Sequence, residues 1–61
     1  MSEVLLRRSE VEARTRLSRS TIYEWMKVGK FPKPVKLGTR LVAWRRSDID
    51  AWIESRMPEG E

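Results

Sequence analysis

The side chains best suited to chemistry in this chain are hydroxyl and basic groups gathered between positions 18 and 27. On a helix, Ile22, Trp25 and Met26 fall on one stripe, and the polar side chains fall on the opposite side. Hydroxyl, guanidinium and ammonium groups donate hydrogen bonds to phosphate oxygens and to base edges. The polar side therefore has the composition of a nucleic-acid-binding surface. Its candidate residues are Ser18, Arg19, Ser20, Thr21, Tyr23, Glu24 and Lys27.

Three residues at the start of this helix each have two interpretations. Arg19 could donate two hydrogen bonds to O6 and N7 of guanine, or it could lie over phosphates and add affinity without sequence choice. Ser20 and Thr21 could serve only the helix terminus, where such residues are common. A helix N-terminus also favours phosphate, so we expect both hydroxyls to contact it.

Tyr23 and Glu24 lie further along the polar side. Aromatic residues of small domains usually belong to the core, but Tyr23 lies between Ser20 and Lys27, which favours contact of its hydroxyl with a phosphate or a base. Glu24 could accept a hydrogen bond from N4 of cytosine, or pair with Lys27 three residues later. Of these two, we favour the pair within the helix.

The elements that must position these residues begin with a pair of helices. Ser9 and Glu12 have the spacing of a capping box, which predicts a first helix over residues 10–14 with Val11 and Ala13 buried. A turn over residues 15–17 follows.

The second helix is predicted over residues 18–28, with Ser18 as its N-cap and Gly29 as the left-handed residue that ends it. Leu17 is the only apolar residue of the preceding turn, so we expect it to pack between the two helices. Two helices joined by a three-residue turn are typical of a helix-turn-helix.

A short hairpin follows the second helix. Two strands are predicted over residues 35–37 and 40–44, around Gly38-Thr39 in a type II′ turn. Residues 4–6 are long enough for a further strand, or for an apolar staple against the first helix. Because an isolated hairpin is marginally stable, this one must pack on the helices as a wing. Its rim carries two cations, Lys36 and Arg40.

Three arginines extend the candidate surface. Arg40 is best placed to enter a minor groove, with a solvated hairpin charge as the alternative. Arg45 and Arg46 precede the last helix, where cations interact unfavourably with the helix dipole. A phosphate nearby would offset that cost, so we expect both arginines to contact it.

The last helix is expected to be scaffold. Ser47 is its predicted N-cap, with Asp50 as the second member of a capping pair, and its buried stripe consists of Ile49, Trp52 and Ile53.

Size and composition limit the classes of protein that this chain can belong to. The 61 residues are sufficient for one domain, which we assign to residues 1–57 with a frayed tail over 58–61. The absence of cysteine and histidine excludes disulfides and the usual zinc sites, and no carboxylate pair suits a catalytic pocket. We therefore expect no enzymatic activity and no cofactor, and a core built on Trp25, Trp44 and Trp52. No membrane span or signal peptide is visible, so we expect a cytoplasmic protein.

Charge is divided unevenly along the chain. Residues 7–46 hold twelve Lys and Arg against three acids, a net charge of +9, and the remaining residues hold one Arg against six acids, a net charge of −5. This division favours one docking orientation on a polyanion.

Five blocks of sequence, in order, resemble the AlpA family of small prophage-associated DNA-binding regulators. They are LLRRSEV (5–11), LSRSTIY (17–23), FPKPVKLG (31–38), AWR (43–45) and DIDAWI (48–53). The resemblance implies a compact winged helix-turn-helix, mainly α with a small β-hairpin, comprising three helices and a two-stranded wing. It also implies a kinship in fold with excisionases and MerR-type regulators. The family usually has a glycine where this chain has Arg16, which would cost of order 1 kcal/mol if the turn needs a positive φ.

The function that the resemblance implies is regulation of transcription by sequence-specific binding to double-stranded DNA, with the second helix in the major groove. The alternatives are an excisionase-like recombination factor, or an adaptor that binds an integrase or RNA polymerase. An RNA-binding role is weaker, because the chain offers no aromatic platform for splayed bases. One such domain buries only about 600–1,000 Å² on DNA, so we expect a monomer or weak dimer that cooperates on tandem sites or uses a partner.

Overall fold

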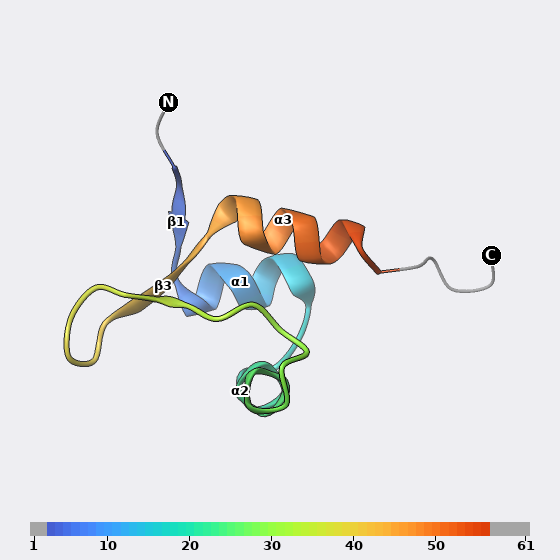
Figure 1. The fold of residues 1–61 in the computed structure, drawn as a ribbon, viewed down its shortest axis with the longest axis horizontal. Coiled ribbons are helices and arrows are strands. Elements are labelled where there is room, and N and C mark those ends of the chain that lie inside the picture. The colour runs from blue at the N-terminus through green and yellow to red at the C-terminus, as the bar shows by residue number, and fades with distance from the viewer. Residues whose placement is uncertain (1–2, 57–61) are drawn as a thin grey trace.

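The computed structural model describes residues 3–56, which form three helices and a three-stranded antiparallel sheet (Figure 1). In chain order the elements are β1 (Leu5–Leu6), α1 (Arg8–Thr15), α2 (Arg19–Lys27), β2 (Val35–Lys36), β3 (Val42–Arg45) and α3 (Arg46–Glu54). The predicted fold class is confirmed, whereas the predicted tail over 58–61 lies outside the described residues. Over residues 3–56, no helix is long and apolar enough to cross a bilayer.

The sheet has the order β1-β3-β2, so the last strand of the chain lies in the middle. Leu6 of β1 lies opposite Trp44, and Val35 of β2 lies opposite Ala43. The apolar segment before α1 is therefore a strand, and the predicted two-stranded ribbon gains a third strand that ties the start of the chain to β3.

The loop between β2 and β3 differs from the predicted two-residue turn. The strands end earlier than expected, and the loop spans residues 37–41. Gly38 lacks the positive φ that a type II′ turn requires, so that prediction was wrong. The amides of Leu37 and Gly38 instead both donate to the carbonyl of Leu41, at 2.7 and 3.1 Å. We use "wing" for β2, this loop and β3 together.

The first helix is longer than predicted and is capped differently. It begins at Arg8 rather than Glu10, and the backbone N–H of Arg7 donates to the Glu10 carboxylate at 2.7 Å. The predicted Ser9–Glu12 capping box was therefore wrong. Glu12 accepts instead from the guanidinium of Arg8 at 2.9 Å, one helical turn away.

The turn between α1 and α2 contains the expected left-handed residue. Arg16 has φ 64° and ψ 18°, and its N–H donates to the carbonyl of Glu12 at 2.7 Å. The turn keeps the conformation that glycine would favour and accepts arginine in it. Leu17 follows, half-buried against the core, as expected of the residue between the two helices.

The core draws one or two side chains from nearly every element. Trp44 and Ile22 are fully buried, as are Val11 of α1 and Ile49 of α3. Trp25 and Trp52 pack against this cluster while staying half-buried. The three tryptophans therefore belong to the core, as predicted, but only Trp44 is enclosed.

Two residues predicted on buried stripes are exposed. Ala13 lies on the outer side of α1, and Ile53 of α3 is 38% exposed. The inward positions of these helices are taken by Val11 and Ile49, each 0% exposed. Both predictions were wrong because helices of eight and nine residues present only a narrow stripe of side chains to so small a core.

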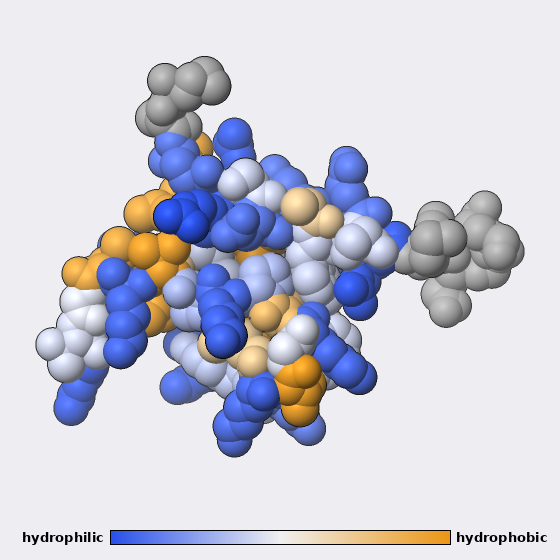
Figure 2. Space-filling model, in the orientation of Figure 1, coloured by the Kyte–Doolittle hydropathy of each residue, from blue (hydrophilic) through white to orange (hydrophobic). Residues whose placement is uncertain are grey.

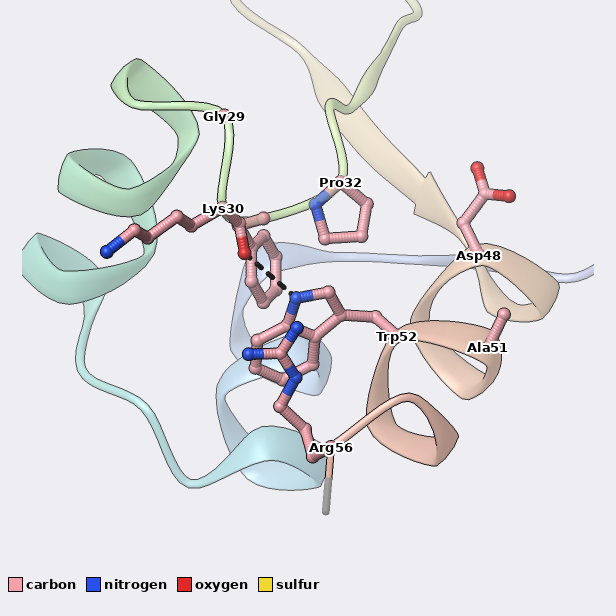
Figure 3. A pocket seen from close by; sticks show the side chains of 8 residues that line it. Gly29, Lys30, Pro32, Asp48, Ala51, Trp52 and Arg56 are labelled. Carbon is pink, nitrogen blue, oxygen red and sulfur yellow. Dashed lines mark hydrogen bonds between the residues drawn. The ribbon is translucent and has the colours of Figure 1, made fainter.

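The segment after α2 is held by hydrogen bonds from two indoles. The Nε1–H of Trp44 donates to the carbonyl of Pro32, and the Nε1–H of Trp52 donates to the carbonyl of Lys30, each at 2.9 Å. Figure 3 shows the second of these bonds, with the guanidinium of Arg56 lying over the Trp52 ring at 4.6 Å. These residues border an open depression of about 780 Å³ between residues 29–32 and α3.

The last helix is capped by a residue 44 positions earlier. Arg45 occupies its N-cap position and makes no side-chain cap. The hydroxyl and backbone N–H of Ser47 both donate to the carboxylate of Glu3, at 2.9 and 3.4 Å, so the prediction of Ser47 as N-cap was wrong. The side-chain bond from Ser47 is the main cause that holds the pKa of Glu3 below its ordinary value.

Candidate nucleic-acid interface

The second helix is capped at both ends as its sequence predicts. The Ser18 hydroxyl accepts the backbone N–H of Thr21 at 3.3 Å and donates to the Thr21 hydroxyl at 3.0 Å. Gly29 follows the helix with φ 76°. Ile22 is fully buried behind the helix, so the opposite side is turned away from the core. We call that side the polar face of α2; it consists of Arg19, Ser20, Tyr23, Glu24 and Lys27.

Arg19 and Tyr23 lie one turn apart on the polar face. The guanidinium carbon of Arg19 is 5.9 Å from the centroid of the Tyr23 ring, within the range of a cation–π contact. Arg19 itself is exposed, whereas Tyr23 is half-buried. The ring supports the guanidinium while leaving its N–H donors open to solvent.

One depression separates Tyr23 from the wing. It has a volume of about 500 Å³ and a largely apolar floor to which Met26, Pro34 and Val42 contribute. Three ammonium groups surround this floor: Lys27, Lys33 and Lys36.

A second depression, also lined by Tyr23, lies between the start of α1 and the wing. Its volume is about 280 Å³, and Leu41 and Val42 form its wing side. Three guanidinium groups border it: Arg7, Arg8 and Arg40. We call these two depressions, together with the Tyr23 side chain that lines both, the Tyr23 surface.

No carboxylate lines either depression, although α1 and α2 carry three acids. The structure therefore gathers six cations around one half-buried tyrosine. Lys27, Lys36 and Arg40 were predicted from the sequence. Arg7, Arg8 and Lys33 were missed, because the packing of α1 against the wing and the path of residues 30–34 leave no mark in residue spacing.

Glu24 and Lys27 do not form the expected ion pair. Over residues 3–56, ion pairs shorter than 4 Å join Arg8 with Glu12, and both Arg14 and Arg46 with Asp50. The prediction of an intrahelical Glu24–Lys27 pair was wrong. Both side chains are exposed, where the gain from such a pair is small against the entropy of holding two long chains.

Arg45 and Arg46 lie apart from the Tyr23 surface. Both are exposed at the start of α3, which Figure 1 shows beside β1 and across α1 from α2. The backbone N–H of Arg46 donates to the carbonyl of Val4 at 2.8 Å, and its guanidinium is 3.9 Å from Asp50. The Asp50 carboxylate therefore offsets part of the unfavourable interaction between Arg46 and the dipole of α3, which we had expected a phosphate to offset.

The helix pair, the central strand β3 and the wing beside α2 define a small winged helix-turn-helix protein. A model of the family described as "Prophage CP4-57 regulatory protein (AlpA)" matches residues 4–57. The chain belongs to this AlpA family, and the resemblance noted in its sequence is confirmed.

Two curated relatives are similar over most of the chain. A protein of Enterobacteria phage P4 named "Uncharacterized protein ORF88" is 47% identical over 55 residues, which cover 90% of this chain and 62% of the relative. The "DNA-binding transcriptional activator AlpA" of Escherichia coli (strain K12) is 34% identical over 58 residues, which cover 85% of this chain and 83% of the relative. The chain thus spans somewhat less than two thirds of the phage protein.

Proposed function

We propose that this protein binds double-stranded DNA as a sequence-specific regulator of transcription of the prophage type. In this proposal the polar face of α2 enters the major groove, and the wing lies on the flanking groove or backbone. The observation that carries it is the Tyr23 surface, in which six cations border two depressions that no carboxylate lines, although one of them, Arg8, also pairs with Glu12. The name of the Escherichia coli relative, a DNA-binding transcriptional activator, supports the same conclusion.

We assign phosphate contacts and base contacts to different parts of the surface. The cations of the Tyr23 surface suit phosphates, because ammonium and guanidinium groups spaced along two depressions follow a backbone without choosing bases. Arg19 suits base recognition, because its planar fork of donors matches O6 and N7 of guanine. Its cation–π contact with Tyr23 restricts the side chain before DNA arrives, which lowers the entropic cost of binding.

A titration of labelled duplex at low salt tests whether DNA is bound at all. We expect fluorescence anisotropy to report binding of random duplex at or below micromolar protein, since non-specific sites have Kd values of about 10⁻⁴–10⁻⁶ M even at physiological salt. A lack of binding at micromolar protein would contradict the proposal and favour a protein-interaction role.

Arg19→Ala tests the base contact. The preference for a duplex selected from a random library over random duplex should fall by about tenfold, because a bidentate pair with guanine contributes about 1–3 kcal/mol of discrimination. Arg14→Ala is the matched control, since it removes the same charge from an ion pair with Asp50 on α3. Equal losses of Arg19→Ala on both DNAs would assign Arg19 to a phosphate instead.

A further inference from the structure

The sheet has one side that the core does not cover. Leu6 and Trp44 lie opposite each other and are buried, so they mark the side that faces the helices. Because successive strand residues alternate, their neighbours face the other way. We call that side the outer sheet face; its exposed residues are Leu5, Leu37, Leu41 and Arg45, whereas Val35 on the same side is half-buried and Ala43 is only 3% exposed.

Three leucines of the outer sheet face are open to solvent. Leu5, Leu37 and Leu41 are 41%, 49% and 53% exposed. Figure 2 shows the corresponding apolar area over the wing and β1, at one end of the molecule. A contiguous apolar area rimmed by polar groups marks a contact site more often than isolated exposed side chains do.

We propose that the outer sheet face binds the exposed side of α3 in a second copy of this chain, head to tail. The matching surface on α3 combines an apolar and an acidic residue. Ile53 is 38% exposed, and the carboxylate of Glu54 follows it. On the sheet side, Arg45 lies beside Leu5 in the strand pairing and offers the complementary charge.

Charge complementarity selects α3 over a second sheet face. Arg45 and Glu54 are both exposed, and neither forms an ion pair within 4 Å among residues 3–56. Glu3 lies close enough for the charge of Arg45 to help lower its pKa, but hydrogen bonds to Ser47 occupy that carboxylate. Two outer sheet faces would bring like guanidinium groups together, whereas α3 brings a carboxylate.

The two surfaces lie toward opposite ends of the molecule. Figure 1 places β1 and the wing at one end of the longest axis and the last turn of α3 toward the other, with α2 on a third side. A contact between different surfaces does not close on itself, so it can repeat along a row of copies. The polar face of α2 belongs to neither surface, although Leu41 lies both on the outer sheet face and at the rim of the Tyr23 surface.

The contact should be weak in free solution and effective on DNA. A face of three short strands offers less area than a standard interface, which buries about 1,200–2,000 Å². Adjacent sites on one duplex raise the effective concentration of neighbouring copies into the range where a weak contact forms. The association of copies on one duplex rests on the proposed DNA binding, whereas the contact between two copies in solution does not.

Nuclear magnetic resonance of the free chain tests the contact without DNA. Between about 20 μM and 2 mM, a range suited to a weak contact, we expect amide shifts that move together at Leu5, Leu41 and Ile53. Shifts confined to the sheet would indicate a two-fold contact and overturn the head-to-tail arrangement. The absence of any concentration dependence would overturn the contact itself.

A charge exchange tests the pairing of Arg45 with Glu54 in the same DNA-free experiment. Arg45→Glu and Glu54→Arg should each weaken self-association by about tenfold, because each places like charges together. The double variant restores opposite charges and should recover most of the loss. An equal mixture of the two single variants should also recover most of the loss, because the sheet face of each variant carries the charge opposite to that on α3 of the other. Loss without recovery in the double variant would contradict the assignment.

Tandem sites test the consequence for DNA. Leu5→Ser and Ile53→Ser should lower the cooperativity of binding to a duplex with two adjacent sites by about tenfold, while affinity for a single site stays within about twofold. Val28→Ser is the matched control, since Val28 is 63% exposed and belongs to neither surface. Unchanged cooperativity in both variants would overturn the proposed contact. A wild-type chain that does not bind a single site would overturn the proposed function instead.

Discussion

Arg16 holds the turn between α1 and α2 in a conformation that costs an ordinary side chain about 1 kcal/mol. Arg16→Gly removes the clash of the Cβ and should raise the free energy of unfolding by about 0.5–1 kcal/mol in urea titrations. Ala13→Gly is the control, because the same change inside α1 should lower it by about 1 kcal/mol. A fall in stability for Arg16→Gly would show that the arginine side chain stabilises the turn by more than its backbone costs.

Glu3 links stability to pH. Its pKa is lowered in the folded chain, chiefly by the hydrogen bond from Ser47, so this carboxylate contributes stability above its ordinary pKa and loses it as the pH falls through the lowered value. In urea titrations from about pH 7 to about pH 3, the wild type should lose its advantage over Glu3→Gln only at the acidic end. An advantage that is constant over the whole range would mean that the charged form of Glu3 is not the one that binds Ser47.

Among the elements, the segment after α2 depends on two indole hydrogen bonds. Trp44→Phe removes a fully buried donor to Pro32 and leaves a small cavity, so it should cost about 2–3 kcal/mol of unfolding free energy. Trp52→Phe removes a similar bond to Lys30 at a half-buried ring and should cost about 1 kcal/mol. Chemical denaturation of both variants checks the order, and equal costs would contradict the role of burial.

The same elements show how far the sequence alone determines local structure. The cap of α2 was predicted because Ser18 acts on the helix that it begins. The cap of α3 could not be, since its partner Glu3 is 44 residues distant and arrives through the pairing of β1 with β3. For α1, the predicted Ser9–Glu12 pair placed the helix start too far along the chain, because the backbone N–H of Arg7 donates to Glu10 and the helix begins at Arg8.

The residues of the candidate site likewise fall into those that the sequence predicted and those that only the fold brings together. The polar face of α2 follows from helical periodicity, so Arg19, Tyr23 and Lys27 could be named as candidates from the sequence. Arg7 and Lys33 join the Tyr23 surface only because the start of α1 and the segment after α2 both come close to Tyr23 in the fold. Periodicity orders residues within one element, whereas the position of one element against another depends on the core.

At the scale of the whole molecule, charge predicts a steep salt dependence of DNA binding. If the six cations of the Tyr23 surface neutralise about six phosphates, the logarithm of the binding constant should fall with the logarithm of salt concentration at a slope near −5. Anisotropy titrations at several salt concentrations measure this slope. Lys33→Ala should reduce it by about one, and an unchanged slope would remove Lys33 from the contact.

The hydrogen bonds between Glu3 and Ser47 also fix the place where the backbone enters the domain. That entry lies beside the start of α3, across α1 from α2 (Figure 1). A biosensor could therefore be built by attaching a linker ahead of Glu3 and immobilising the protein on a chip. Every copy would then present α2 away from the support, in a uniform orientation for capture of duplex from solution.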